Sequence, residues 1–291
     1  MKTLKYYFGR AKKEKWAIGQ FNFSDWSQVR GILEAAKVLK SPVILGTSEG
    51  ESKFVGLQEA VAMRNVLRKK YNLPIFLNLD HGKSFEYVKE AIDAGYDMVH
   101  FDGSKLSLEE NIKMSKKIKN LIGWKGVVME GEVGRIGTDA SKMYTEKFEI
   151  KEEDLTQVKD AELYVKQAGV DVLAVSVGTF HGMDVTGVSP NLRMDRLREI
   201  KSKIELPLVL HGGSGTPEND IKEAIKLGIC KININTETRL AFSNTLRKTL
   251  GVISLSAGGE IVPYKYLPEA IHAVQAVVEK NIKLFGSEGK A

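Results

Sequence analysis

The sequence predicts an α/β fold, a single (β/α)₈ TIM barrel, and two observations support this prediction. Short apolar segments alternate with amphipathic segments of helical periodicity along nearly the whole chain of 291 residues. Three of the apolar segments lead into a histidine followed by glycine, at His81, His181 and His211. A doubly wound open sheet is the alternative, but it gathers its site at one crevice, whereas here polar residues follow many strands. We therefore expect one barrel domain over residues 1–291.

Eight strands are expected, each short, apolar and mostly without alternation, as strands buried on both faces should be. They cover residues 17–21, 43–45, 75–79, 98–101, 127–130, 172–175, 208–210 and 231–234. Helices are expected between and after them, among others at 27–39, 85–94, 221–227 and 236–250. In the first of these, apolar residues recur with the spacing i, i+3, i+4, i+7 of a helix buried on one face.

Two connections and the C-terminus depart from a minimal barrel. Residues 131 to about 156 follow the fifth strand and are far longer than a usual connection, so we expect a mobile loop that acts as a lid. A shorter excursion covers residues 182–191. Residues 268–284 form an extra C-terminal helix.

Composition and charge limit the kinds of partner. Hydrophobic residues make up 43% and charged residues 27% of the chain, which is typical of a globular protein with a large core. The net charge of +6 suits anionic substrates, but the lysines form only scattered doublets, so we expect no nucleic acid partner. Cys230 is the only cysteine, which fits a reducing compartment. No signal peptide or membrane-length apolar segment is evident, so we expect a cytoplasmic protein that does not bind membranes.

In a barrel, the residues just past the strand C-termini share one rim. The polar residues expected there are Asn22, Ser48, Asp80, His81, Asp102, Ser104, Glu130, Glu132, His181, His211, Asn233, Asn235 and Thr236. Three converging neutral imidazoles with an open fourth position are what a catalytic zinc site requires, and three unrelated surface histidines are the alternative. His100 and His272 do not fit this pattern, and we expect both to be structural, with His100 in the barrel wall or the strand–helix layer.

The rim carboxylates allow more than one role. Asp80 precedes a candidate ligand, so it could exchange a proton with a substrate hydroxyl or orient His81. Asp102 and Glu132 could support an alternative metal position or hold the imidazoles, and Asp102 could instead cap the following helix.

Residues 211–217 form a glycine-rich segment that precedes a helix. Backbone N–H groups in such a loop can bind an anion, helped by the helix dipole. Phosphate sites after the seventh and eighth strands recur in this fold, and residues 233–236 would complete one. A simple turn without a ligand is the alternative.

Taken together, these motifs resemble the class II, metal-dependent ketose-bisphosphate aldolases, chiefly fructose-1,6-bisphosphate aldolase. The resemblance runs almost end to end and includes GQFN at 19–22, SPVIL at 41–45, LDHG at 79–82, FDGS at 101–104, MEGE at 129–132, GTFHG at 178–182, HGGSG at 211–215, KININT at 231–236 and LFGS at 284–287. It implies a catalytic Zn²⁺ held by His81, His181 and His211, with room for a monovalent cation. Cobalt and iron would suit the same ligands.

The resemblance also implies roles for other residues. Asp80 would handle the proton of the substrate C4 hydroxyl, and Asp102 and Glu132 look like secondary metal-site carboxylates. The residues expected to bind the substrate are Asn22, Ser48, Gly182, Gly212, Ser214, Asn233, Asn235, Thr236 and Arg239, the last at a position that family members use for a second phosphate.

Three departures from the family pattern concern the substrate. No lysine follows the second His-Gly, and Asp184 stands there instead. Asn235 occupies a position where fructose-type members usually have aspartate. The loop acid that would move the C3 proton is Asp139, with Glu146 as the alternative.

The sequence thus predicts zinc-dependent, reversible cleavage of fructose 1,6-bisphosphate to dihydroxyacetone phosphate and glyceraldehyde 3-phosphate, a reaction of glycolysis and gluconeogenesis. Tagatose 1,6-bisphosphate or a related ketose phosphate is the alternative substrate. A non-catalytic descendant that binds metal and a sugar phosphate is the alternative from another class. By resemblance, we expect a homodimer or homotetramer.

Overall fold

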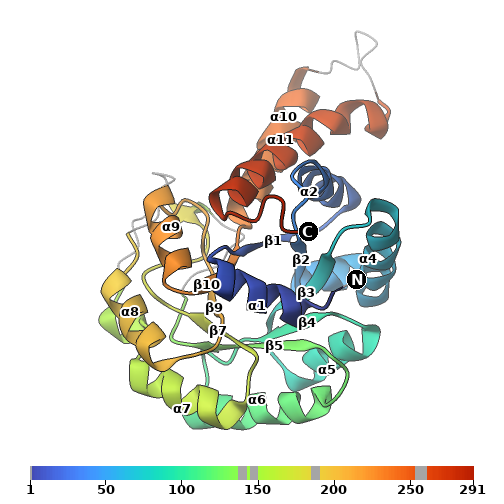
Figure 1. Ribbon diagram of the computed structural model, residues 1–291. Helices are drawn as coiled ribbons and strands as arrows, with labels where there is room; N and C mark the ends of the chain where they lie inside the picture. The colour runs from blue at the N-terminus through green and yellow to red at the C-terminus, as the bar shows by residue number, and fades with distance from the viewer. Residues whose placement is uncertain (1, 137–142, 145–149, 185–190, 253–260) are drawn as a thin grey trace.

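A computed structural model describes residues 2–136, 143–144, 150–184, 191–252 and 261–291. Eight parallel strands form a closed barrel in the order β1-β10-β9-β7-β5-β4-β3-β2 (Figure 1). Their bounds are β1 (Ile18–Asn22), β2 (Val43–Ser48), β3 (Ile75–Gly82), β4 (Met98–Phe101), β5 (Val128–Val133), β7 (Val172–Val175), β9 (Leu208–Leu210) and β10 (Ile229–Asn233). The predicted barrel is confirmed, and each strand lies within a few residues of its predicted position.

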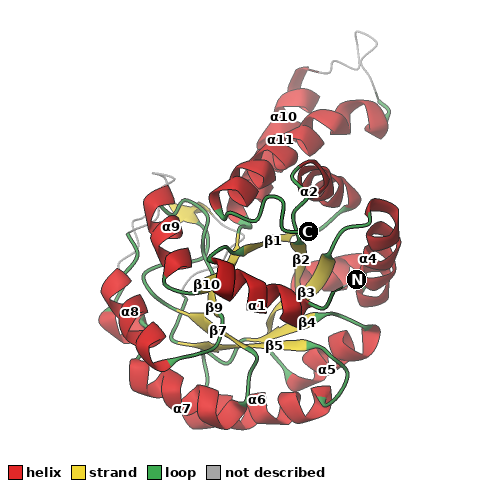
Figure 2. Ribbon diagram, in the orientation of Figure 1, coloured by secondary structure: helices red, strands yellow, loops and turns green. Residues whose placement is uncertain are grey.

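Helices surround the strands on the outside of the barrel, as Figure 2 shows. They are α2 (Trp26–Val38), α4 (Leu57–Tyr71), α5 (Phe85–Ala94), α6 (Leu108–Ile122), α7 (Val158–Ala168), α8 (Met194–Lys203), α9 (Glu218–Lys226) and α10 (Thr236–Val252). Several of them begin at a side-chain cap. At α6, for example, Ser107 and Glu110 form a capping box that satisfies two backbone N–H groups at the helix start.

The N-terminal helix α1 (Leu4–Glu14) was not predicted. It lies across one end of the barrel (Figure 1), and its buried side chains Leu4, Tyr7 and Phe8 belong to a core cluster with residues from the starts of the strands. This end is opposite the strand C-termini. The helix therefore closes the apolar interior of the barrel at its N-terminal end and leaves the other end for polar residues.

The C-terminal helix is longer than predicted. Helix α11 (Pro263–Leu284) packs on α2 and α10, and Figure 1 shows α10 and α11 side by side, extending away from the barrel. It begins at Pro263, which the first turn of a helix tolerates because the missing N–H has no intrahelical partner there. None of the helices in the described part of the chain is both long and apolar enough to span a bilayer.

The two excursions meet near the barrel mouth. Strands β6 (Met143–Tyr144) and β8 (Met183–Asp184), one from each excursion, pair in parallel. The 3₁₀ helix η1 (Glu152–Asp154) follows, and the side chain of Glu152 accepts hydrogen bonds from Arg193 and Arg196 of the α8 region. The end of the long connection is thus fastened to the barrel. Its predicted mobility stays a prediction.

Candidate active site

A cavity of about 1180 Å³ opens where the C-terminal ends of the strands meet. It is lined by predicted site residues from different strands, among them Asn22, Ser48, Asp80, His81, Asp102, His181, Asn235 and Arg239. This is the end of the barrel at which the loops after the strands can place polar side chains around one space.

An irregularity in β3 turns two neighbouring side chains into this cavity. The register between β3 and β4 shifts between Leu79 and Gly82, and His81 has a φ of 54°, which side chains other than glycine rarely adopt. In a regular strand, Asp80 and His81 would point to opposite faces. The local distortion lets both line the cavity.

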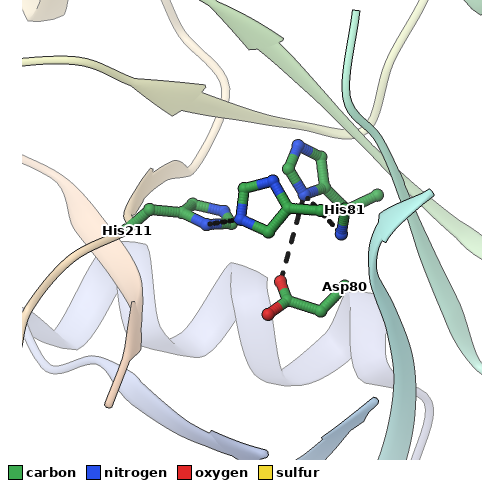
Figure 3. Close-up of side chains that lie close together, drawn as sticks. Asp80, His81 and His211 are labelled. Carbon is green, nitrogen blue, oxygen red and sulfur yellow. Dashed lines mark hydrogen bonds and ion pairs between the residues drawn. The ribbon is translucent and has the colours of Figure 1, made fainter. Parts of the chain in front are cut away.

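Three imidazoles from three strands converge at this point. The ring centroid of His81 lies 4.6 Å from that of His181 and 4.8 Å from that of His211, and the last two are 5.8 Å apart. Figure 3 shows the rings of His81 and His211 side by side, with the carboxylate of Asp80 directed toward the same space. The Nε2 atom of His81 lies 3.1 Å from Nδ1 of His211. The structure thus brings together the three histidines that the sequence singled out.

Two of these rings have a carboxylate next to the nitrogen that faces away from the shared space. Nδ1 of His81 lies 2.9 Å from Asp102, and Nε2 of His211 lies 2.5 Å from Glu130. Glu130 in turn accepts a hydrogen bond of 2.7 Å from Lys231, with both side chains fully buried. Each ring therefore directs its other nitrogen to the shared space. Carboxylates orient metal-binding histidines in this way.

Asp102 does not act as a helix cap. The N-cap of the following helix α6 is Ser107, whereas Asp102 contacts His81 and accepts hydrogen bonds from the backbone and hydroxyl of Ser104. The structure therefore excludes the cap and has Asp102 beside an imidazole, while its predicted role at an alternative metal position stays a prediction.

His100 does not lie where it was predicted, in the barrel wall or the strand–helix layer, and its predicted structural role stays a prediction. Its side chain is fully buried next to the cluster, with its ring centroid 4.6 Å from that of His81 and its Nε2 3.2 Å from Glu132. His100 pairs in register with Glu130 on the neighbouring strand, so both residues face the barrel interior, while Val99 faces the helices. The search for His-Gly pairs overlooked it because no glycine follows it.

Asp80 lies at the centre of a set of amides. Asn22, Asn233 and Asn235 each place a side-chain nitrogen within 2.9, 3.1 and 3.4 Å of its carboxylate oxygens. Burial would raise the pKa of Asp80, but the nearby positive charges, led by His81, hold it well below its usual range. Asp80 is therefore a carboxylate, held by neutral donors that do not themselves exchange protons at neutral pH.

The charges of the histidines differ. Burial disfavours an imidazolium, but Asp80 and Asp102 outweigh it and raise the pKa of His81 to about 9. Burial and the charge on His81 lower the pKa of His181 to about 3 and that of His211 well below its ordinary value. Two of the three rings are therefore neutral, the form in which imidazole binds a metal.

The chemistry of the donor set fits a metal ion. The side chains of Asp80, His81, His100 and His211 bring one ligand atom each within 4.8 Å of one another, and so do those of His81, Asp102 and Glu132. In the described part of the chain, Oε2 of Glu132 and Nε2 of His100 are buried 3.2 Å apart as an ion pair, and neither makes a well-aligned hydrogen bond. Such atoms are costly to bury unless a ligand satisfies them, and a cation coordinated by this cluster would do so.

The glycine-rich loop after β9 lies against the turn after β10. The backbone N–H of Gly213 donates to the carbonyl of Asn233, and the N–H of Glu237 donates to the hydroxyl of Ser214. Gly212 has a φ of 63°, and a Cβ there would lie 2.4 Å from a backbone carbonyl oxygen of Phe180. The two segments and the His181-Gly182 turn therefore approach so closely that only glycine fits at position 212.

Arg239, in the first turn of α10, lines the cavity. Its guanidinium pairs with Glu51 at 2.6 Å. Glu51 belongs to the short helix α3 (Glu49–Val55) and forms a capping box with Ser48. Sequence reasoning missed Glu51, although a serine followed three residues later by glutamate is the signature of a helix start.

Some predicted residues lie outside the described part of the chain. They are Asp139 and Glu146, the two candidates for the loop acid. Buried Lys231 was missed altogether, because a lone lysine in an apolar strand carries no signal without its partner.

Comparison with known proteins agrees with this arrangement. Residues 2–290 match the family model of fructose-bisphosphate aldolase class-II. A probable fructose-bisphosphate aldolase from Bacillus subtilis (strain 168) is 37% identical over 284 residues, covering 97% of this chain and 96% of that protein. A 6-phospho-5-dehydro-2-deoxy-D-gluconate aldolase from Shouchella clausii is 39% identical over 284 residues, covering 97% and 93%. Among solved structures, the YdjI aldolase from Escherichia coli K12 has a TM-score of 0.83 at 29% identity, with all of both chains covered.

Proposed function

This chain belongs to the class II fructose-bisphosphate aldolase family, and we propose that it reversibly cleaves a ketose phosphate to dihydroxyacetone phosphate and an aldehyde. The observation that carries this proposal is the convergence of His81, His181 and His211 beside a carboxylate held by three amides. The relatives are named for different sugar substrates, so the family leaves the sugar open. Fructose 1,6-bisphosphate is the first candidate, and tagatose 1,6-bisphosphate is the second.

We propose that His81, His181 and His211 hold a divalent metal ion, and that this ion is zinc, which three imidazoles suit. When bound, the ion would polarise the ketone carbonyl of the substrate and so favour negative charge on it during cleavage. Glu130 and Asp102 would fix the ring orientations from behind. Glu132, whose Oε2 is buried 3.2 Å from Nε2 of His100, would complete a secondary position next to Asp102.

Asp80 would act on the hydroxyl proton at C4. As the C3–C4 bond breaks, the C4 hydroxyl loses its proton to the carboxylate, C4 becomes the aldehyde carbon, and the bonding pair stays on the three-carbon half. The three amides around Asp80 would fix its carboxylate for this transfer. C3 then takes a proton, for which Asp139 is our first candidate donor and Glu146 the second.

The phosphate of the three-carbon half would bind to the loop after β9 and the turn after β10. Gly182, Gly212 and Ser214 would contribute from the first of these segments and the neighbouring turn, and Asn233, Asn235 and Thr236 from the second; the backbone N–H of Gly213 donates to Asn233 and so joins the two segments. Backbone N–H groups and hydroxyls there would bind the anion near the start of a helix. Holding the phosphate fixes the carbonyl against the metal position and the C4 hydroxyl against Asp80.

Aldol cleavage by the purified protein tests the proposal. We expect release of dihydroxyacetone phosphate from fructose or tagatose 1,6-bisphosphate, loss of that activity with EDTA, and recovery with zinc. In a single-turnover experiment, Asp80→Asn should bind metal like the wild type and release no product. A wild-type protein that holds stoichiometric zinc and cleaves no ketose phosphate would reject catalysis and favour a binding function.

A further inference from the structure

One buried ion pair sits where the far end of the substrate would lie. Glu51 pairs with Arg239 in the wall of the cavity, next to Asn22 and Ser48. The side chain of Glu51 is 10% exposed and that of Arg239 is 25% exposed. Any role of this pair in recognition rests on the proposed function, because it concerns the aldehyde half of the same substrate.

Glu51 is held in place by three hydrogen bonds to its carboxylate. Oε1 accepts from Arg239 at 2.6 Å, and Oε2 accepts from the side chain of Asn22 at 3.0 Å and the backbone N–H of Ser48 at 2.8 Å. Asn22 in turn donates to Asp80. The negative charge of Glu51 is therefore a fixed part of the site and not a mobile surface charge.

This charge changes what Arg239 can bind. A guanidinium that already faces a carboxylate offers little net attraction to a phosphate dianion, and the dianion would also be repelled by Glu51 itself. A carboxylate has about four acceptor positions, and three on Glu51 are used. The remaining position can accept a hydrogen bond from a hydroxyl group.

We infer that Glu51 is a specificity-determining residue that adapts this site to an aldehyde with hydroxyl groups and no phosphate at its far end. The preferred substrate in the cleavage direction would then be a ketose 1-phosphate with an uncharged distal end, and the two 1,6-bisphosphates named above would be cleaved less efficiently. The pair of Glu51 and Arg239 would bind the uncharged end by hydrogen bonds, and Glu51 would disfavour a second phosphate by repulsion.

Other cations line the cavity on another side. Lys83, Lys105 and Arg135 follow β3, β4 and β5, whereas Glu51 follows β2 and Arg239 follows β10. Glu51 would have little effect on the binding of a distal phosphate by Lys83, Lys105 and Arg135. The experiment must therefore separate the two locations.

A matched pair of aldehydes gives this separation. D-Glyceraldehyde and D-glyceraldehyde 3-phosphate differ only in the distal phosphate, and each is condensed with dihydroxyacetone phosphate by the zinc-loaded protein. In this direction, C3 of dihydroxyacetone phosphate loses a proton and bonds to the aldehyde carbon, and the aldehyde oxygen gains a proton. The measured quantity is the ratio of the two kcat/KM values, in which any general defect of a variant cancels.

For the wild type, we expect kcat/KM to be at least as high for D-glyceraldehyde as for its 3-phosphate. In Glu51→Gln, we expect the ratio to move toward the phosphorylated aldehyde by about tenfold or more, since one charge about 6 Å from a dianion is worth about tenfold even at the dielectric constant of water. The double variant Glu51→Gln/Arg239→Gln should lose this shift, because it also removes the guanidinium.

Glu49→Gln is the matched control. Glu49 lines the same cavity and carries the same charge, but it contacts the backbone N–H of Lys83 and not Arg239. Equal shifts in Glu49→Gln and Glu51→Gln would overturn the inference, and so would a wild type that prefers the phosphorylated aldehyde tenfold.

Exchange of the C3 proton of dihydroxyacetone phosphate in D₂O needs no aldehyde and reports on the proposed function alone. Its absence in the wild type would reject aldolase chemistry, and with it the inference. Exchange accompanied by condensation with neither aldehyde would overturn the inference and leave the proposed function standing.

Discussion

Replacing Lys231 should destabilise the fold more than replacing any exposed lysine. In Lys231→Met, the fully buried carboxylate of Glu130 loses its hydrogen bond of 2.7 Å to the lysine and keeps the contact with His211. Removing one partner of a buried ion pair costs about 3–5 kcal/mol, because the remaining charge stays out of water without compensation. We expect a loss of that size in the free energy of unfolding from urea denaturation of the metal-free protein.

The double variant Glu130→Gln/Lys231→Met tests the physical reason. The double variant also removes the carboxylate that Lys231→Met leaves without its lysine. We therefore expect its loss in the free energy of unfolding to be at least about 1 kcal/mol smaller than the sum of the losses in the two single variants. Lys12→Met is the control, because Lys12 pairs with Glu205 at the surface and such pairs contribute about 0–1 kcal/mol. Additive losses in the double variant, or equal losses in Lys231→Met and Lys12→Met, would refute the reasoning.

Three further outcomes are expected. Burial raises the pKa of Asp171, but the hydrogen bond from Lys119 contributes to a net lowering. The ionised carboxylate therefore stabilises the fold fully above a pH of about 4, and this stabilisation is lost as the pH falls through the folded-state pKa. Asp171→Asn should therefore cost about 1–3 kcal/mol at pH 7, with the difference narrowing below pH 4 in urea titrations. Gly212→Ala should cost about 1–3 kcal/mol and weaken binding of dihydroxyacetone phosphate in calorimetry, because its Cβ would meet a backbone carbonyl at 2.4 Å, whereas Gly9→Ala, with nothing within 4 Å, should not weaken it. Zinc at a hundred times its dissociation constant should stabilise the chelator-treated protein by about 2.7 kcal/mol, and His211→Ala should abolish that gain in thermal melts.

The barrel could be predicted because each strand can be recognised from its own residues. Segments such as residues 75–79 and 208–210 are short and apolar on both faces, which is what a strand enclosed by helices requires. The rim residues could be predicted by the same reasoning, since a strand end fixes where the next side chains lie. Helix α1 was overlooked although Leu4, Tyr7, Phe8 and Ala11 have the spacing of a helix buried on one face; what the local pattern could not give is that this face covers the barrel end.

The inner layer of the site could not be predicted in the same way. His100 and Lys231 lie within strands, and only the register between neighbouring strands brings them to the predicted rim residue Glu130. A single polar residue in a strand can face the helices or the barrel interior, and one residue of register decides between them. The β3 irregularity is a second example, because alternation along that strand would have placed either Asp80 or His81 outside the cavity.

The site has two parts. One would bind the three-carbon half that all substrates of this reaction share, and the other would bind the half that differs between sugars. In the proposed function, the histidines would hold the metal and the loops after β9 and β10 would bind the phosphate of the three-carbon half. These loops are joined by backbone hydrogen bonds, and Glu130 and Lys231 behind the histidines are fully buried. Glu51 and Arg239 lie on short helix α3 and at the first turns of α10, and their contact is a single ion pair at the cavity wall. Changing that pair to neutral residues of similar shape would alter the charge met by the distal end while Asn22, which donates to both Glu51 and Asp80, could keep its acceptors. A family with one reaction and several sugars needs such a separation, because specificity at the aldehyde end can then change while the proton transfer at Asp80 is kept.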